Sequence, residues 1–334
     1  MADSLTREKR IDLLERMLLM RRFEEMVIHV AVAHKYIGRN HLYIGHEATG
    51  AVMMSLLGNG DLTYTTHRNH GHLIARGVDP GKALAEIMGR EGGLNGGRGG
   101  TWHGCDPTHG FQSTSAMVGG SVGLSVGGAY HLHRTAKGRI SVALFGDGAL
   151  DEGISYEALN YASVFGLPLL FLCENNAKTG ERPSSMLAAN RLGDVPNALR
   201  IPSAVVDGTD VEALHATLSK AVQHVRDAGT PYFVEAKFER WPGSHQLKPE
   251  FTTGITDVTM GWDESKIGGA HAEWLRKCDP IRLYVRTLVT DNVMTKDNVL
   301  ALDKKVNDCM AAARSYAEAS PFPKPETAVA GVFA

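Results

Sequence analysis

The sequence lacks any apolar run that approaches the roughly 18–20 residues needed to span a membrane. Its N-terminal segment is charged and amphipathic, unlike the uninterrupted apolar stretch of a secretory signal. Neither sign of charge dominates, because 35 Lys and Arg residues are matched by 37 Asp and Glu residues. A general nucleic-acid-binding protein normally carries a basic excess. We therefore expect a cytoplasmic protein with no membrane and no nucleic-acid partner.

Cysteine is scarce as well. The 334-residue chain has four cysteines, which are widely spaced and form no Cys-x-x-Cys pair. This distribution predicts reduced thiols and no disulfide framework. No internal repeat or low-complexity segment is present. The glycine-rich stretch 92–104 lacks the Gly-Lys-Ser/Thr ending of a nucleoside-triphosphate loop. It is either a flexible linker or a backbone that closely approaches a ligand or partner.

The chain is organised around residues 140–176, where two apolar runs each end in a polar turn. The first run ends at a Gly-Asp-Gly turn containing Asp147, and the second ends at a double asparagine containing Asn176. A helical pattern lies between the runs, which makes the whole a βαβ unit. Parallel strands in such a unit end at the same sheet edge, so Asp147 and Asn176 should lie close together. Carboxylate and amide oxygens there suit a divalent cation beside a bound phosphate.

Further βα patterns flank this unit and predict the fold class. We expect an α/β fold with a doubly wound, mostly parallel sheet and helices on both faces, forming one domain over residues 1–334. Helices are predicted over residues 5–36, 46–57 and 211–228 and in the tail from 279, strands over 204–206 and 232–238, and an extended arm over 320–334.

Residues 112–133 are rich in small side chains, with glycines 119, 123 and 127 at fourfold spacing. This spacing leaves a smooth helical stripe on which another helix can pack closely. We predict a buried helix here, with a loosely formed loop as the alternative.

Residues 61–72 place one arginine and three histidines at a predicted strand end and loop. These side chains are Arg68, His67, His70 and His72. Three interpretations are open: a solvated polar loop, a zinc site, and an anion-binding edge. We favour the anion-binding edge, because arginine beside imidazoles suits phosphate oxygens by charge and by the number of hydrogen-bond donors.

The Gly-Asp-Gly turn and the double asparagine at this spacing resemble the thiamine-diphosphate enzymes. More narrowly, the chain is similar to the α subunit of the E1 component of two-subunit 2-oxo acid dehydrogenases, such as pyruvate, branched-chain 2-oxo acid and acetoin dehydrogenases. The motifs that carry this likeness run nearly end to end and include His41-Leu42-Tyr43, Gly45-His46-Glu47-Ala48, Arg68-Asn69-His70-Gly71-His72, Gly97-Arg98-Gly99-Gly100, Glu157-Ala158-Leu159-Asn160 and Ala319-Ser320-Pro321-Phe322-Pro323.

The resemblance implies two cofactors, thiamine diphosphate and Mg²⁺. The metal would be held by Asp147, Asn176 and the backbone carbonyl of Lys178, and Val118 would bend the cofactor as an apolar wedge. The residues implied to bind the cofactor are His67, Arg68, Ala116, Val118, Gly146, Asp147, Gly148, Ala149, Asn176 and Lys178. Those implied to take part in catalysis are His41, His70 and His245.

The resemblance also implies a partner. In this family the glutamate that activates the cofactor ring comes from the β subunit, so we expect an α2β2 heterotetramer and read Glu152 and Glu157 as structural. The implied reaction decarboxylates a 2-oxo acid, or cleaves acetoin, and passes the acyl unit to lipoamide on an acyltransferase (E2).

Two departures from the family pattern leave an alternative open. Ser244 stands where the family usually has a histidine tied to acyl transfer, with His245 one residue later, and Lys178 follows the double asparagine. The alternative is a carboligase with the same cofactor and partner but an aldehyde or ketone as acceptor.

Overall fold

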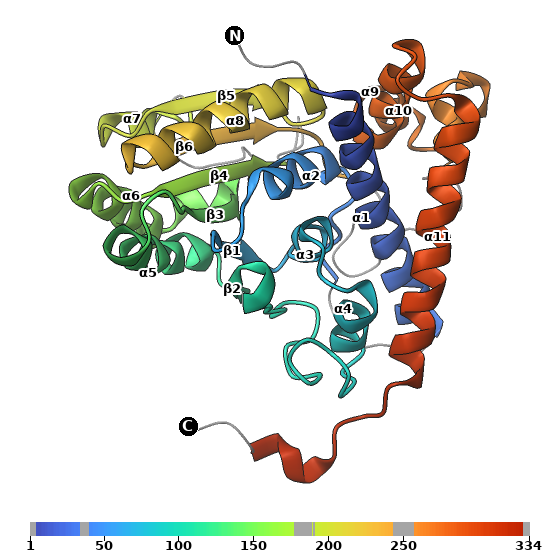
Figure 1. Cartoon of the computed structure of the whole chain (residues 1–334), viewed down its shortest axis with the longest axis horizontal. Coiled ribbons are helices and arrows are strands. Elements are labelled where there is room, and N and C mark those ends of the chain that lie inside the picture. The colour runs from blue at the N-terminus through green and yellow to red at the C-terminus, as the bar shows by residue number, and fades with distance from the viewer. Residues whose placement is uncertain (1–4, 34–39, 177–188, 190, 243–256, 330–334) are drawn as a thin grey trace.

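A computed structural model describes residues 5–33, 40–176, 189, 191–242 and 257–329. Six parallel strands form a sheet in the order β2-β1-β3-β4-β6-β5 (Figure 1). The strands are β1 Leu62–Thr66, β2 Phe111–Ser115, β3 Ser141–Gly146, β4 Leu169–Asn175, β5 Ser203–Asp207 and β6 Tyr232–Lys237. The predicted doubly wound α/β fold is confirmed.

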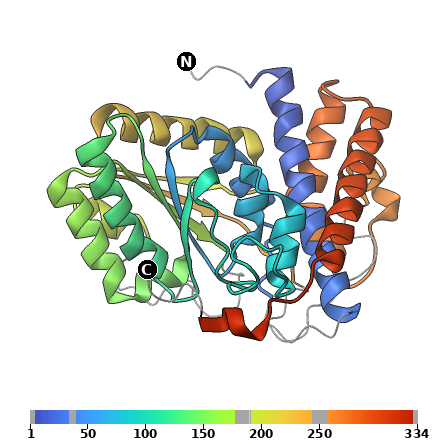
Figure 2. The same ribbon diagram turned by 60° about the horizontal axis from the view of Figure 1, so that its bottom comes forward.

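Alternating apolar side chains of the central strands feed two separate cores. Ala143 and Phe145 of β3 pack with the helices of one face, whereas Val142 and Leu144 pack with those of the other. This period of two explains why the strands are apolar along their whole length, because both faces of the sheet are buried. Figures 1 and 2 show the helices on the two faces.

The helices divide unevenly between these two cores. The core that contains Phe145 includes α5 (Gly120–Thr135), α6 (Gly153–Phe165) and α7 (Asp194–Ala198). The larger core contains α1 (Arg7–Ala33), α2 (Glu47–Leu56), α3 (His70–Arg76), α4 (Pro80–Ile87), α8 (Val211–Ala228), α10 (Pro280–Thr290) and α11 (Lys296–Ala319). Of these, α1 and α11 run side by side (Figure 1). None of the helices among the described residues is long and apolar enough to cross a membrane.

Strand order reverses beside β1. The chain leaves β1 for β2 on one side and then returns to place β3 on the other side of β1. Because the connections on either side of such a reversal diverge, a crevice opens at the carboxyl ends of the two strands. The crevice lies where residues 66–68 and 146–148 follow β1 and β3.

The prediction of one helix over residues 112–133 is wrong at its N-terminal end. The first residues form β2, and α5 begins at Gly120 after Gly119 adopts φ 78°. A Cβ on Gly119 or Gly123 would meet Ile154 of α6, whereas one on Gly127 would meet nothing within 4 Å. The close approach between helices therefore involves two of the three glycines.

The glycine-rich loop is folded around a buried carboxylate. Glu86 of α4 is 1% exposed and accepts hydrogen bonds from the backbone N–H groups of Asn95 at 2.6 Å, Gly97 at 3.0 Å and Gly99 at 2.5 Å. A Cβ on Gly97, whose φ is 76°, would lie 2.6 Å from the backbone carbon of Gly89. Glycine here permits a tight, ordered turn, so the flexible-linker interpretation is wrong.

A second buried charge joins three helices. Arg21 of α1 is fully buried and donates to Glu47 of α2 at 2.6 Å and to Asp279 at 3.0 Å. Asp279 also accepts from the backbone N–H of Ile281 and so caps α10. Removing any one member would leave an uncompensated charge in the core, which is the costly case for buried ion pairs.

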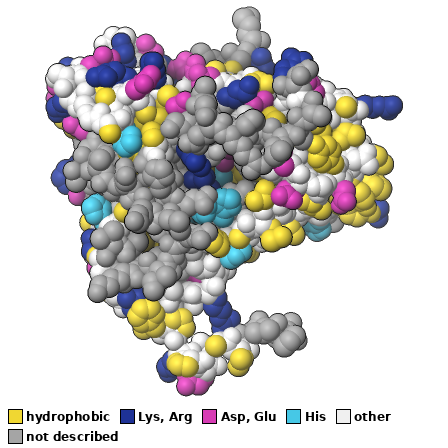
Figure 3. Space-filling model, turned by 180° about the vertical axis from the view of Figure 1, so that it is seen from behind, with side chains coloured by type: hydrophobic (Ala, Val, Ile, Leu, Met, Phe, Trp, Pro, Cys, Tyr) yellow, Lys and Arg dark blue, Asp and Glu magenta, His cyan; other side chains and the backbone are white. Residues whose placement is uncertain are grey.

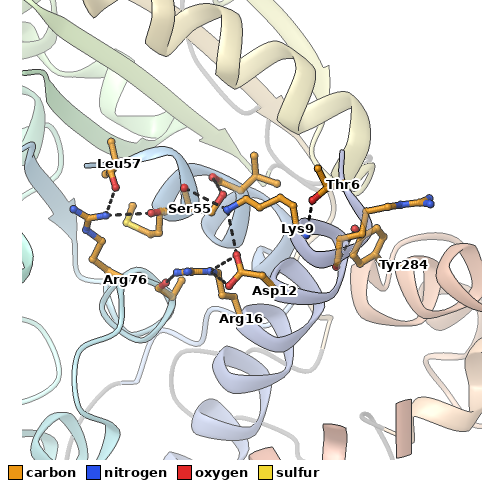
Figure 4. A network of polar contacts seen from close by, with 12 residues as sticks. Thr6, Lys9, Asp12, Arg16, Ser55, Leu57, Arg76 and Tyr284 are labelled. Carbon is orange, nitrogen blue, oxygen red and sulfur yellow. Dashed lines mark hydrogen bonds and ion pairs between the residues drawn. The ribbon is translucent and has the colours of Figure 1, made fainter. Parts of the chain in front are cut away.

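The side chain of Arg76 in α3 covers the C-terminal end of α2 (Figure 4). It donates to the carbonyl oxygens of Met54 in α2, of its C-cap Leu57 and of Gly58. The last carbonyls of a helix have no partner within the helix, so a guanidinium with several donors is suited to satisfy them.

Replacing Arg76 with methionine should therefore destabilise the fold. Arg76→Met keeps much of the apolar stem but removes the guanidinium donors from the carbonyls of Met54 and Leu57, and we expect the free energy of unfolding to fall by about 2 kcal/mol. Urea unfolding followed by circular dichroism measures this loss. Arg134→Met on the exposed side of α5 is the matched control and should change stability by less than about 0.5 kcal/mol. Equal effects of the two variants would contradict this interpretation.

Candidate active site

A pocket of about 210 Å³ occupies the crevice between β1 and β3. Residues at the carboxyl ends of five strands (β1, β2, β3, β4 and β6) and one residue that precedes α2 line it, as parallel strand ends require. Its lining residues are His46, Thr66, His67, Arg68, Met117, Val118, Gly119, Gly146, Asp147, Gly148, Ala149, Glu174, Asn176 and Arg240.

Arginine and histidine enter the pocket from the end of β1. Arg68 is buried, and its Nη1 donates to the backbone carbonyl of Leu42. Burial, followed by the nearby charge of Arg240, lowers the pKa of Arg68 to about 10. Burial also lowers the pKa of His67 to about 4, with Arg68 adding to the effect. The two arginines therefore form a cationic wall beside a neutral imidazole, which favours an anion between them.

Asp147 enters from the end of β3, in the short helix η2 (Asp147–Asp151). Its carboxyl group is largely buried, and burial raises its pKa to about 6. The backbone N–H groups of Asp147 and Asn176 act in the opposite direction but only partly offset the burial. A cation bound to this carboxylate would compensate for its lost hydration.

Two glycines flank Asp147 and leave space beside it. A Cβ built on Gly146 or Gly148 would meet nothing within 4 Å, and neither residue has a positive φ. The backbone would therefore accept a side chain at either position. The absence of one keeps the pocket open next to the carboxylate, as a bound group that approaches the backbone requires.

The end of β4 contributes Asn176 and Glu174. The strands β3 and β4 pair with Gly146 opposite Glu174, which brings Asn176 to the edge that carries Asp147. Glu174 accepts a hydrogen bond from the hydroxyl of Tyr43 and lies 3.2 Å from Nε2 of His72. Burial and then the charge of Glu174 raise the pKa of Tyr43 well above its usual value. This network fixes the floor of the pocket.

His46 reaches the pocket from the turn before α2. It is 0% exposed, and its Nε2 lies 2.9 Å from Nδ2 of Asn176. Burial, followed by the charge of Arg68, lowers its pKa well below the usual value, although the nearby backbone of Ile44 acts the other way. The ring is therefore neutral at physiological pH.

The structure brings together most of the predicted cofactor-binding residues. Those that line the pocket are His67, Arg68, Val118, Gly146, Asp147, Gly148, Ala149 and Asn176. Ala116 lies in the turn between β2 and α5 but is not part of the lining. Lys178, Ser244 and His245 lie outside the described residues.

Two predicted catalytic histidines lie behind the pocket instead of lining it. The ring of His41 packs against His67 at a centroid distance of 4.2 Å, and burial lowers its pKa to about 3. His70 begins α3, so the predicted loop is helical there, and its ring contacts Glu24 at 3.2 Å and the Thr101 carbonyl at 3.1 Å. The solvated-loop interpretation of this segment is wrong for His70 and His72, which are both buried.

Sequence reasoning missed several pocket residues. His46, Glu174 and Arg240 all lie close to an element end, and Arg240 follows β6 by three positions (237 to 240). The strand-edge argument that found Asp147 could have found Glu174 and Arg240. His46 was part of a family motif, Gly45-His46-Glu47-Ala48, but the strand-edge argument did not place it in the pocket, because it precedes the helix α2 and does not follow a strand.

Among the described residues, no group of three or more His, Cys, Asp or Glu side chains could hold a metal. The zinc interpretation of the histidines therefore has no support in this part of the chain. One carboxylate and one amide oxygen fit Mg²⁺, which commonly takes one or two protein carboxylates, keeps waters and completes its shell with phosphate oxygens.

Comparison with known proteins gives a consistent result. The family "Dehydrogenase E1 component" matches residues 15–326. The α subunit of acetoin:2,6-dichlorophenolindophenol oxidoreductase from Bacillus subtilis is 32% identical over 99% of this chain and 95% of its own length. The pyruvate dehydrogenase E1 component α subunit from Rhizobium meliloti is 32% identical over 92% of this chain and 85% of its own length. The chain therefore belongs to the dehydrogenase E1 component family, as its strand-edge motifs predicted.

Proposed function

We propose that the pocket holds the diphosphate end of thiamine diphosphate with Mg²⁺, and that the chain is the α subunit of a 2-oxo acid or acetoin dehydrogenase. The observation that carries this proposal is the pairing, within one small pocket, of the buried carboxylate of Asp147 with the guanidinium groups of Arg68 and Arg240. A divalent cation complexed with a diphosphate satisfies both signs of charge at once.

Each part of the pocket would have its own task. Asp147 and Asn176 would bind the metal through oxygen atoms, with the Lys178 carbonyl as a third ligand. Arg68 would bind the diphosphate, and the open space at Gly148 would let phosphate oxygens approach the backbone. Val118, which is half exposed at the rim, would contact the cofactor ring.

Thiamine diphosphate supplies the carbanion that attacks the substrate carbonyl and the electron sink for cleavage of the carbon–carbon bond. This chain would bind and orient the cofactor, but the carboxylate that activates the ring would come from a β subunit. Glu174, a buried carboxylate of the lining, is already hydrogen-bonded to Tyr43, so it serves structure in our proposal.

An exposed apolar surface beside the pocket supports a protein partner. This α5–α6 surface comprises Met117, Val118, Leu124, Tyr130, Ile154, Tyr156, Tyr161, Val164 and Phe165, and Met117 and Val164 are 75% and 70% exposed. Figure 3 shows hydrophobic side chains gathered on this side of the molecule. Large exposed apolar patches commonly mark protein interfaces. Since Met117 and Val118 also line the pocket, a subunit bound here would cover its mouth.

The acceptor of the acyl unit is proposed to be lipoamide on an E2 acyltransferase. The carboligase alternative rests on Ser244 and Lys178, which lie outside the described residues, and the related proteins support the dehydrogenase assignment.

Loss of the proposed metal ligand should abolish cofactor binding. Asp147→Ala removes the carboxylate, and we expect Mg²⁺-dependent affinity for thiamine diphosphate to fall by at least about a hundredfold in calorimetry. Asp151→Ala removes an exposed carboxylate from the same short helix and should change the affinity by less than about threefold. Unchanged binding by the Asp147 variant would refute the assignment.

The purified chain alone should show almost no turnover of pyruvate or acetoin, because the activating carboxylate lies on another polypeptide. Adding the partner subunit should restore activity by several orders of magnitude, measured with an artificial electron acceptor. Robust turnover by this chain without a second polypeptide would disprove the two-chain proposal.

Charge placed on the α5–α6 surface should impair assembly. Val164→Asp puts a carboxylate in the apolar patch and should weaken association with the partner at least tenfold, as measured by sedimentation. Leu300→Asp alters a 43% exposed leucine on α11, outside this surface, and serves as the control. If both variants assemble as well as the unmodified chain does, the partner binds elsewhere.

A further inference from the structure

The imidazole of His46 is held rigidly against a proposed metal ligand. Its ring packs against Tyr43 at a centroid distance of 4.9 Å and against Phe238 at 4.4 Å, with interplanar angles of 35° and 70°. The side chain is fully buried. Aromatic neighbours from the segment before α2 and from the residue after β6 therefore fix the direction in which Nε2 points, and that direction is toward Nδ2 of Asn176 at 2.9 Å.

The chemistry of this contact assigns a proton. An amide nitrogen carries two hydrogens and no acceptor lone pair, so it can only donate. Nε2 of His46 must therefore be the acceptor, and the proton of the neutral ring must lie on Nδ1. Nδ1 itself is buried and has no hydrogen-bond partner among the described residues, so the assignment rests on the contact between Nε2 and the Asn176 amide. His46 is thus set up as a fixed acceptor facing Asn176.

The contact also decides which end of the Asn176 amide is available to a ligand. The oxygen and nitrogen of the amide are bonded to one carbon, so fixing the nitrogen on His46 turns the oxygen away from the imidazole. Only the oxygen can ligate a cation, and a rotation by 180° would present hydrogens to the metal instead.

We propose that His46 is a positioning residue that orients the Asn176 amide so that its oxygen ligates the divalent cation. This inference rests on the function proposed above, in which Asn176 binds the metal. Partners that orient metal ligands commonly change metal affinity by about 10- to 100-fold when they are removed. A histidine in this role is distinct from a ligand, because His46 would not touch the metal.

The test exploits a substitution that makes orientation irrelevant. In Asn176→Asp both ends of the side chain are oxygen, so no partner is needed to choose between them. His46→Met removes the acceptor while it keeps an apolar side chain of similar length. His46→Gln is the conservative variant, since its side-chain oxygen can take the place of Nε2.

The measurement is the affinity for Mn²⁺ in the presence of thiamine diphosphate, followed by electron paramagnetic resonance of the free ion in the chain assembled with its partner subunit. With asparagine at 176, His46→Met should weaken Mn²⁺ binding by about 10- to 100-fold, and His46→Gln should stay within about threefold. When combined with Asn176→Asp, His46→Met should have less than about a twofold effect of its own.

Equal weakening by His46→Met in both backgrounds would show a merely structural role and overturn the proposal. If that variant does not fold, as judged by circular dichroism, His46→Asn replaces it. Its shorter side chain cannot reach the position of Nε2, so it should lose the affinity that His46→Gln retains, and equal affinities of these two would also overturn the proposal. Failure of the unmodified complex to bind Mn²⁺ would instead refute the proposed metal site and this inference with it.

Discussion

The in-register parallel pairing of β3 with β4 is the constraint on which the site depends. It places Gly146 opposite Glu174, so the turns that follow both strands emerge at one edge of the sheet. The strand reversal beside β1 adds the segment that carries Arg68 to the same edge. A slip of one residue between β3 and β4 would exchange the faces of the sheet and send Phe145 into the wrong core. The hydrophobic core and the pocket are therefore specified by the same register.

Buried charges hold the segments around this edge in place. Glu86 organises the glycine-rich loop, the end of which contacts His70 and Asn69 through Thr101. Arg21 of α1 joins this helix to α2 through Glu47 and to α10 through Asp279. Each such group is costly to bury unless its partners are complete. The cost is offset here by several donors or acceptors per charge, and the result is a rigid support for a pocket built from loops.

The pocket itself contrasts with this support, because its charges are less well compensated. Burial shifts the pKa of Asp147 upward and that of Arg68 downward, so both groups are held in forms that a ligand of mixed charge would stabilise. Titratable groups whose pKa values are shifted by burial in this way are typical of functional sites. Beside them the apolar α5–α6 surface faces solvent, which is consistent with a site that a second chain completes.

The sequence by itself determined the fold class, the family and the convergence of Asp147 with Asn176, because strand periodicity and turn chemistry are local signals and the parallel βαβ unit has one geometry. The amphipathic pattern of residues 211–228 likewise predicted a helix there, and the structure has that helix with the same bounds. Other features depended on residues far apart in the chain. The glycine-rich stretch could be a linker or an approach loop until Glu86 was seen at its centre, and the start of residues 112–133 became a strand because β1 offered it an edge. Only the tertiary structure placed His46 against Asn176, 130 positions away. Hydrophobic periodicity shows which face of a helix or strand is buried, but it does not show which residues of distant segments contact each other.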